Sequence, residues 1–150
     1  MRKIISAVIL VLSFWGYAGA QAGDVKAVWN SNVACGGTIT ENTILAADLD
    51  CSGVIGTALT IGADNIVLDG NGYKIIAPNA SVVVSIIGRS NVTTRNIDLS
   101  GPAGHQRGYG LYLITVINSL IENVTAHNRE YGIFSDWPVF RQRRGRVDAE

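Results

Sequence analysis

The chain has 150 residues, 47% of them hydrophobic and 16% charged, and its 12 basic and 12 acidic residues give a formal net charge of zero. This length allows one domain around a single core. The balance of charge is uneven, because the stretch from Asp24 to Asp136 holds six basic and ten acidic residues. A body that is acidic on balance lacks the basic face that nucleic-acid phosphates require, so we expect no nucleic-acid partner.

Residues 1–22 have the order of a secretory signal peptide. Two basic residues precede an apolar run from Ile4 to Phe14, and small residues with Ala-x-Ala spacing follow up to Ala22. This order predicts cleavage before Gln21 or Gly23. The alternative, a membrane anchor, needs about 20 apolar residues, and this run is shorter. We therefore expect a secreted, periplasmic or cell-surface protein that has no membrane association after signal cleavage.

Residues 23–34 are predicted to form an N-terminal cap. Val25, Val28 and Trp29 follow one another at helix-like spacing, which predicts a short amphipathic helix. A stack of repeats ends in an open apolar cross-section, and Trp29 is large enough to cover it. Stacking of Trp29 on a ligand is the alternative interpretation.

Cys35 and Cys51 are the two cysteines of the chain. In an exported protein an even pair of cysteines predicts a disulfide. Closing a loop of this length stabilises the fold by roughly 3 kcal/mol in the chain-entropy model. A metal site would need further ligands, and both His residues lie far downstream, so we expect no metal site.

Residues 35–136 consist of short segments rich in Ile, Val, Leu and Thr that are separated by Gly, Asn and Asp. Many of these segments alternate apolar and polar residues, which is typical of strands. An antiparallel sandwich and a parallel β-helix both use such strands. The side chains that we expect to point inward are Ile61, Ile66, Leu68, Val92, Ile97, Leu99, Leu111, Ile121 and Ile133.

A sequence motif that recurs along the chain distinguishes between the two folds. An Asn precedes a β-branched run at Asn65, Asn91 and Asn118, with steps of 26 and 27 residues, and a Tyr-Gly pair recurs 22 residues apart at Tyr109 and Tyr131. Such steps favour an all-β parallel β-helix solenoid, in which like positions stack on one another. Asn side chains at one corner can bond the backbone of their own coil and of the next, so we predict a ladder of the three Asn residues that satisfies buried turn amides.

The segment Cys35-Gly36-Gly37-Thr38-Ile39-Thr40, with Asp48-Leu49-Asp50-Cys51 and the run from Leu59 to Gly72, resembles the opening of a known group of proteins. These are exported bacterial right-handed parallel β-helix proteins of the pectin-lyase-like superfamily. The resemblance implies a right-handed, single-stranded β-helix. It does not imply one activity, because the group includes polysaccharide lyases, hydrolases, epimerases and adhesins.

Residues 137–150 depart from the repeat. Trp137-Pro138-Val139-Phe140 interrupts it, and four Arg residues follow between Arg141 and Arg146. We expect an irregular basic tail here. Because members of the family continue for further coils, the chain resembles a truncated N-terminal portion, and its uncovered last coil is expected to self-associate.

The resemblance also suggests where catalysis would lie. Uronate lyases of the superfamily hold Ca²⁺ with clustered carboxylates and use an Arg or Lys as base. Asp69, Asp98 and Arg95 are the nearest approach to such a set, but their offsets of 29 and 3 residues do not stack them on neighbouring coils. We therefore assign no catalytic residue, and expect no cofactor unless the chain is a lyase, in which case Ca²⁺ is implied.

Tyr109, Tyr112 and Tyr131 are candidates for contact with a sugar, because aromatic rings pack against pyranose C–H faces. The alternative is that Tyr109 and Tyr131 stack on each other across adjacent coils. Gly104-His105-Gln106-Arg107-Gly108 is similar to the Gly-His-Gly element of pectin hydrolases, but Gln replaces the second Gly of that element.

Two functions follow as hypotheses. The first is an exported, non-catalytic solenoid that serves as a surface or carbohydrate-contacting scaffold, with a polysaccharide as its partner. The second is the N-terminal fragment of a lyase-type or hydrolase-type enzyme whose catalytic coils are missing. The residues favour the first and leave enzymatic activity open.

Overall fold

The computed structural model describes residues 29–136 and 141–142, and these residues form twelve strands and no helix. The strands are β1 (Gly37–Ile39), β2 (Thr43–Ile44), β3 (Leu49–Asp50), β4 (Thr57–Ile61), β5 (Val67–Asp69), β6 (Ile75–Ile76), β7 (Val82–Ile87), β8 (Thr93–Asp98), β9 (Tyr109–Ile114), β10 (Leu120–Thr125), β11 (Tyr131–Ser135) and β12 (Arg141–Gln142).

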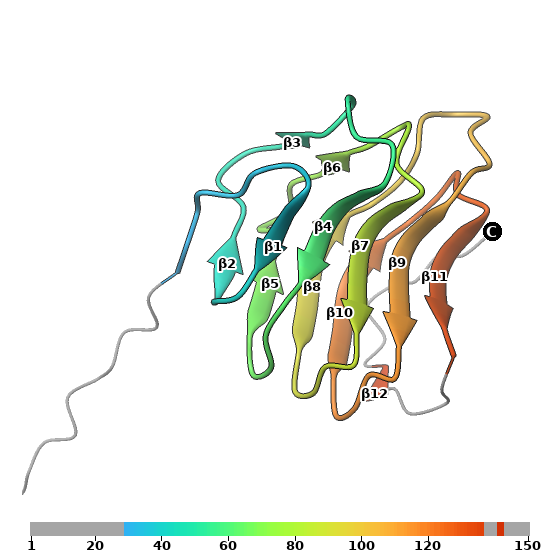
Figure 1. Ribbon diagram of the computed structural model, residues 1–150. Coiled ribbons are helices and arrows are strands. Elements are labelled where there is room, and N and C mark those ends of the chain that lie inside the picture. Colours follow the sequence, from blue (N-terminus) through green and yellow to red (C-terminus); the bar gives the residue numbers. More distant parts are fainter. Residues whose placement is uncertain (1–28, 137–140, 143–150) are drawn as a thin grey trace, which may run out of the picture.

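The strands form three sheets, and all strand pairings among the described residues are parallel. One sheet has the order β1-β4-β7-β9-β11, the second β12-β10-β8-β5-β2, and the third consists of β3 and β6. Figure 1 shows the two long sheets facing each other, with the short sheet along one edge. The protein is therefore a parallel β-solenoid of about four turns, and the antiparallel alternative is wrong.

The register of the parallel strands explains the repeat in the sequence. Gly37 of β1 is paired with Leu59 of β4, and Tyr109 of β9 is paired with Tyr131 of β11. The two residues of each pair therefore lie one coil apart. The basic tail takes part as well, because Arg141–Gln142 forms β12 and pairs with β10. The rest of residues 137–150, and the signal peptide predicted for residues 1–22, lie outside the described residues.

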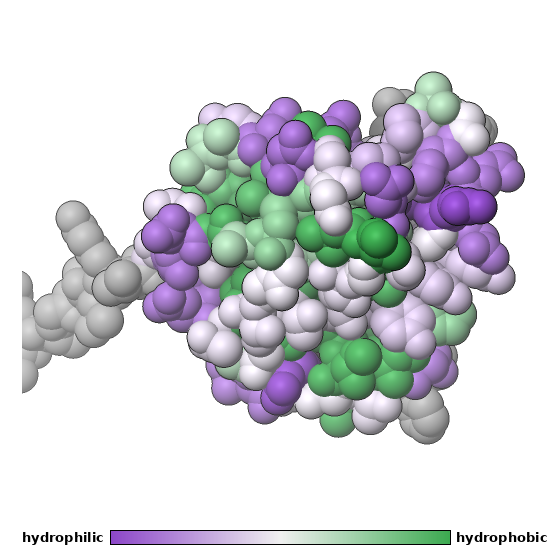
Figure 2. Space-filling model, turned by 45° about the horizontal axis from the view of Figure 1, so that its top comes forward, coloured by the Kyte–Doolittle hydropathy of each residue, from purple (hydrophilic) through white to green (hydrophobic). Residues whose placement is uncertain are grey.

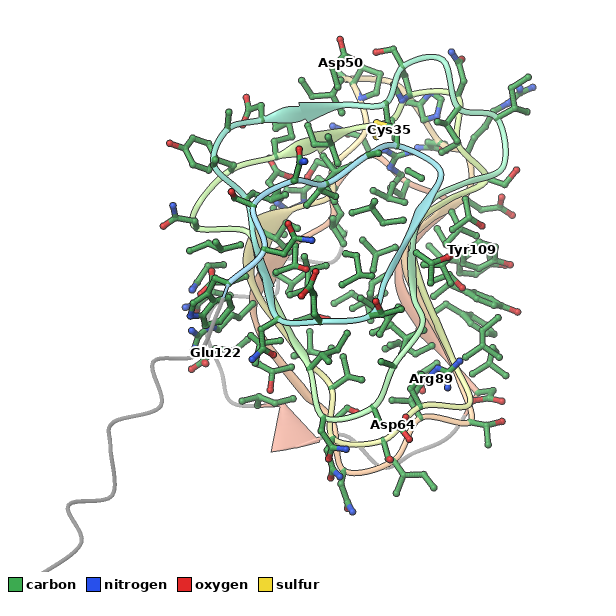
Figure 3. All side chains as sticks on the ribbon, turned by 60° about the vertical axis from the view of Figure 1, so that its left-hand side comes forward. Cys35, Asp50, Asp64, Arg89, Tyr109 and Glu122 are labelled. Atoms are coloured by element: carbon green, nitrogen blue, oxygen red, sulfur yellow. A yellow bond between two sulfur atoms is a disulfide. The ribbon has the colours of Figure 1, made fainter. Side chains whose placement is uncertain are left out.

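The core is an apolar column between the sheets. Eight of the nine residues expected to point inward are buried, and Ile133 is partly buried against them. Figure 3, which looks nearly along the solenoid, shows side chains filling this space. Burial of each such side chain contributes roughly 1.5–3 kcal/mol relative to its exposure to water, so the column provides the driving force for stacking the coils.

The predicted disulfide is present between Cys35 and Cys51, with a Cα–Cα distance of 5.4 Å. It joins the segment before β1 to the residue after β3, and Cys51 is buried. The described part of the chain contains no helix long and apolar enough to cross a membrane.

The predicted N-terminal helix is not seen in the described part of the cap, residues 29–34; residues 23–28 lie outside the description. The backbone at Asn30 pairs with the first coil instead, because its N–H donates to the carbonyl of Asn42 at 2.8 Å and its carbonyl accepts from Ile44 at 2.9 Å. The backbone N–H and C=O of Asn30 thus bond to residues of the first coil, so they are not available for hydrogen bonds within a helix at this position.

Candidate functional site

The outer side of β9 and β11 carries a group of aromatic rings. Register pairs Tyr131 with Tyr109 and Phe134 with Tyr112, while Leu111 on the same strand points into the core. The four rings therefore form a two-by-two array. We call them the aromatic cluster: Tyr109, Tyr112, Tyr131 and Phe134.

Rings that share a register position stack across coils. The centroids of Tyr109 and Tyr131 are 5.0 Å apart with an interplanar angle of 11°, and those of Tyr112 and Phe134 are 5.3 Å apart at 12°. The predicted stacking of Tyr109 on Tyr131 is confirmed. Each ring therefore covers one face of its partner, and Tyr131 remains 45% exposed.

The environment of the cluster disfavours ionisation of Tyr109. Burial raises the pKa of Tyr109, and the neighbouring Tyr131, Glu130 and Tyr112 raise it further. A tyrosine hydroxyl with its ordinary pKa is already protonated in neutral solution, so Tyr109 can donate a hydrogen bond there. Figure 3 shows its side chain pointing away from the solenoid interior.

Tyr109 also forms one wall of an open groove of about 700 Å³. The groove runs between the turns of successive coils and is lined by Asn79, His105, Arg107 and Glu130, among others. This size lies within the range of roughly 300–1,000 Å³ that is typical of ligand pockets. An aromatic wall and several polar groups of both charges thus meet at one place on the surface.

The three catalytic candidates take part in two separate ion pairs, one of which includes Lys74. Asp69 on β5 and Arg95 on β8 are register partners, and Arg95 Nε donates to Asp69 Oδ2 at 2.8 Å. The offsets measured from Asp98 did not clearly predict stacking, but Asp69 and Arg95 do lie on neighbouring coils in register. Asp98 lies on the outer surface beside Lys74, with 3.3 Å between Nζ and Oδ2.

Both carboxylates are structural anions. Burial opposes ionisation of Asp69, but the N–H of Asn71 and the side chains of Asn96 and Arg95 donate to it and hold its pKa below the ordinary value. Burial likewise opposes ionisation of Asp98, whose pKa is lowered by Ser100 and Lys74. Within the described residues, no three His, Cys, Asp or Glu side chains come together as metal ligands.

The Asn residues of the predicted ladder occupy one corner with positive φ: 59° at Asn65, 56° at Asn91 and 50° at Asn118. All three are exposed, so the expectation that they satisfy buried turn amides is wrong. Their backbone has other partners, since the N–H of Asn65 donates to Ser90 and that of Asn91 to Ile117. Asn91 Nδ2 does donate to Asn65 Oδ1 at 2.9 Å.

Sequence reasoning did not identify Phe134 or Glu130 as site residues. Phe134 could have been found from the Tyr-Gly repeat, because aligning Tyr109 with Tyr131 places Phe134 opposite Tyr112. Glu130 has no comparable signal. It lies in a turn outside the repeat, and only the fold places it beside Tyr109.

The chain matches no family model, no curated protein and no solved structure. The structure supports a parallel β-solenoid, which is the architecture that the resemblance implies.

Proposed function

We propose that this protein is an exported, non-catalytic β-solenoid that binds carbohydrate at the groove and the aromatic cluster. The observation that supports this function is the position of Tyr109, which belongs to both features. Its hydroxyl can donate a hydrogen bond in neutral solution, and its side chain lines the groove. Sugars offer apolar C–H surface and hydroxyl groups together, and this combination complements them.

The surrounding groups supply the polar part of such a site. Arg107 and Glu130 are exposed at the groove, and Asn79 is held in place because its Nδ2 donates to the carbonyl of Ser52 at 2.8 Å. The strands beneath are rigid elements, which favours a preorganised site. Figure 2 shows hydrophobic residues in several separate groups on the visible face, with residues of intermediate hydropathy between them.

The proposal includes secretion of the protein and its membership of the pectin-lyase-like superfamily. The disulfide and the leader-like order of residues 1–22 support secretion. The quoted motifs and the parallel strands support a pectin-lyase-like β-helix, and parallel crossovers in proteins are right-handed in about 98% of cases, which supports that hand here.

The enzyme hypothesis has less support. Asp69 and Asp98 each face a cation and carry lowered pKa values, so neither is poised to transfer a proton at neutral pH. Under this hypothesis the catalytic coils are supplied by a longer protein.

Binding of the purified, disulfide-intact chain to a broad array of glycans, followed by calorimetry on the best ligand, tests the proposal. We expect Tyr131→Ala to weaken binding at least tenfold. Tyr73→Ala is the matched control, because Tyr73 is 36% exposed and lies away from the groove and the cluster. Absence of binding by the folded chain, or equal losses in both variants, would contradict the proposal. Release of unsaturated or newly reducing products would instead favour an enzyme.

A further inference from the structure

Arg129 is a buried arginine at the turn between β10 and β11, with only 5% of its surface exposed. Its Nε donates to the carbonyl of Leu99 at 3.2 Å, and its Nη2 donates to the carbonyl of Ala77 at 3.1 Å. The side chain therefore reaches the two preceding coils. These carbonyl contacts orient the guanidinium group but do not neutralise its charge.

One guanidinium nitrogen of Arg129 lacks a hydrogen-bond partner among the described residues. This nitrogen, Nη1, is buried. The two ion pairs of the described residues involve Arg95 and Lys74. Asp98 acts on Arg129 electrostatically but lies beyond ion-pair distance, so no carboxylate accepts a hydrogen bond from Nη1 among the described residues. A buried cation with a free donor is energetically unfavourable unless an anion accompanies it.

A second buried nitrogen without a hydrogen-bond partner among the described residues belongs to His105. This nitrogen is Nε2, and His105 itself lines the groove. Both side chains lie close to Gly101: a Cβ at this position would lie 3.2 Å from His105 Cδ2 and 3.4 Å from Arg129 Nε, and it would press against the carbonyl oxygen of Asn128. Glycine at this position thus allows the imidazole and the guanidinium to approach the same stretch of backbone.

We infer that Arg129 Nη1 and His105 Nε2 form a binding site for one small oxyanion, such as a sulfate or phosphate group. Both nitrogens can donate to an anionic oxygen, and charge-assisted bonds of this kind are stronger than neutral ones. The inference does not depend on carbohydrate binding.

A sulfate titration at constant ionic strength, followed by NMR of the imidazole signals, tests the site. The chain has 2 His residues, so His127 serves as the internal reference. We expect a saturable shift of the His105 signals that His127 does not show. A small linear drift of both signals, which is what a bound water molecule or a general salt effect would produce, would overturn the inference.

Two charge-matched variants locate the anion. Arg129→Gln should weaken sulfate binding at least tenfold, whereas Arg89→Gln should leave it within twofold. Arg89 is the fitting control because its substitution removes the same charge, its Nε is also buried without a partner among the described residues, and it does not line the groove. Equal losses in both variants would indicate non-specific attraction to surface charge and would overturn the site.

If Arg129→Gln does not fold, His105→Phe provides the second test. Sulfate in place of chloride should raise the thermal midpoint of the unchanged chain but not that of His105→Phe, and an equal rise in both would overturn the site. Glucose 6-sulfate, glucose and inorganic sulfate then distinguish the source of the anion. Tighter binding of glucose 6-sulfate than of sulfate assigns the site to an anionic group on a larger ligand. Tighter binding of sulfate assigns it to a free anion.

Discussion

Asn91 Nδ2 donates to Asn65 Oδ1 across one coil at 2.9 Å, although both side chains are exposed. Both residues also have positive φ, 56° and 59°. Asn tolerates this conformation better than most residues because its short polar side chain can bond locally. The recurrence of Asn at this corner is therefore explained first by the backbone and second by the hydrogen bond between side chains.

These two roles can be separated at Asn91. Asn91→Ala should lower the free energy of unfolding by about 1–2 kcal/mol, because a left-handed conformation is unfavourable for Ala. Asn91→Gly loses the same hydrogen bond but keeps the conformational freedom, so it should change stability by less than about 0.5 kcal/mol. Denaturant titration of both variants measures the difference. Equal losses would mean that the side-chain bond is the dominant contribution.

The repeat in the sequence contained more information about the site than the individual motifs did. The step of 26 residues from Asn65 to Asn91 also joins Asp69 to Arg95, and the structure pairs these two residues. Applying the coil step to charged residues would have predicted this ion pair. A repeat of known length thus predicts contacts between outward-facing residues as well as the fold.

Contacts made by irregular turns could not be predicted in this way. Arg129 reaches the carbonyl of Ala77, 52 residues earlier, from a turn that has no constant length between coils. At the N-terminus the spacing of Val28 and Trp29 could not predict that the backbone of Asn30 pairs with the first coil, because this pairing depends on residues of that coil.

Thr94 provides a test of core polarity. Its side chain is fully buried on β8, and its hydroxyl has no partner among the described residues. Thr94→Val should therefore raise the free energy of unfolding by about 1 kcal/mol, because an unsatisfied hydroxyl is replaced by a methyl group of similar shape.

Thr43 is the matched control for Thr94. It is also buried, but its hydroxyl donates to the carbonyl of Glu41 at 3.0 Å. Thr43→Val should lower stability by about 1 kcal/mol. Opposite signs for the two variants in parallel urea titrations are the expected result, and a loss at Thr94 would show that its hydroxyl has a partner in solution.

The Cys35–Cys51 disulfide should stabilise the first coil. A double Cys35→Ala/Cys51→Ala variant is expected to lose roughly 3 kcal/mol, the loop-closure contribution for cysteines 16 residues apart. Reductant should lower the denaturation midpoint of the unchanged chain and leave that of the double variant unaltered. Mass spectrometry of folded, unreduced protein provides the direct check, since two free thiols would contradict the pairing.

Asp69 gives the stability a defined pH dependence. Its pKa is lowered in the folded protein, so its ionised form favours folding above the ordinary carboxyl pKa of about 3.9, and this contribution is lost as pH falls through the folded value. Asp69→Asn should lower the free energy of unfolding by about 2 kcal/mol at pH 7, because Arg95 loses its charged partner. The difference from the unchanged chain should shrink below pH 4.

Glu122→Gln controls for removal of a negative charge from the same surface. Glu122 is the register partner of Arg95 on the next coil, whereas the short contact of Arg95 is with Asp69. Its substitution should change stability by less than about 0.5 kcal/mol at any pH. Urea titrations of both variants from pH 3 to pH 7 separate the two carboxylates. An Asp69→Asn loss that stays constant across this range would assign the effect to packing, and ionisation of Asp69 would then contribute nothing to the stability of the solenoid.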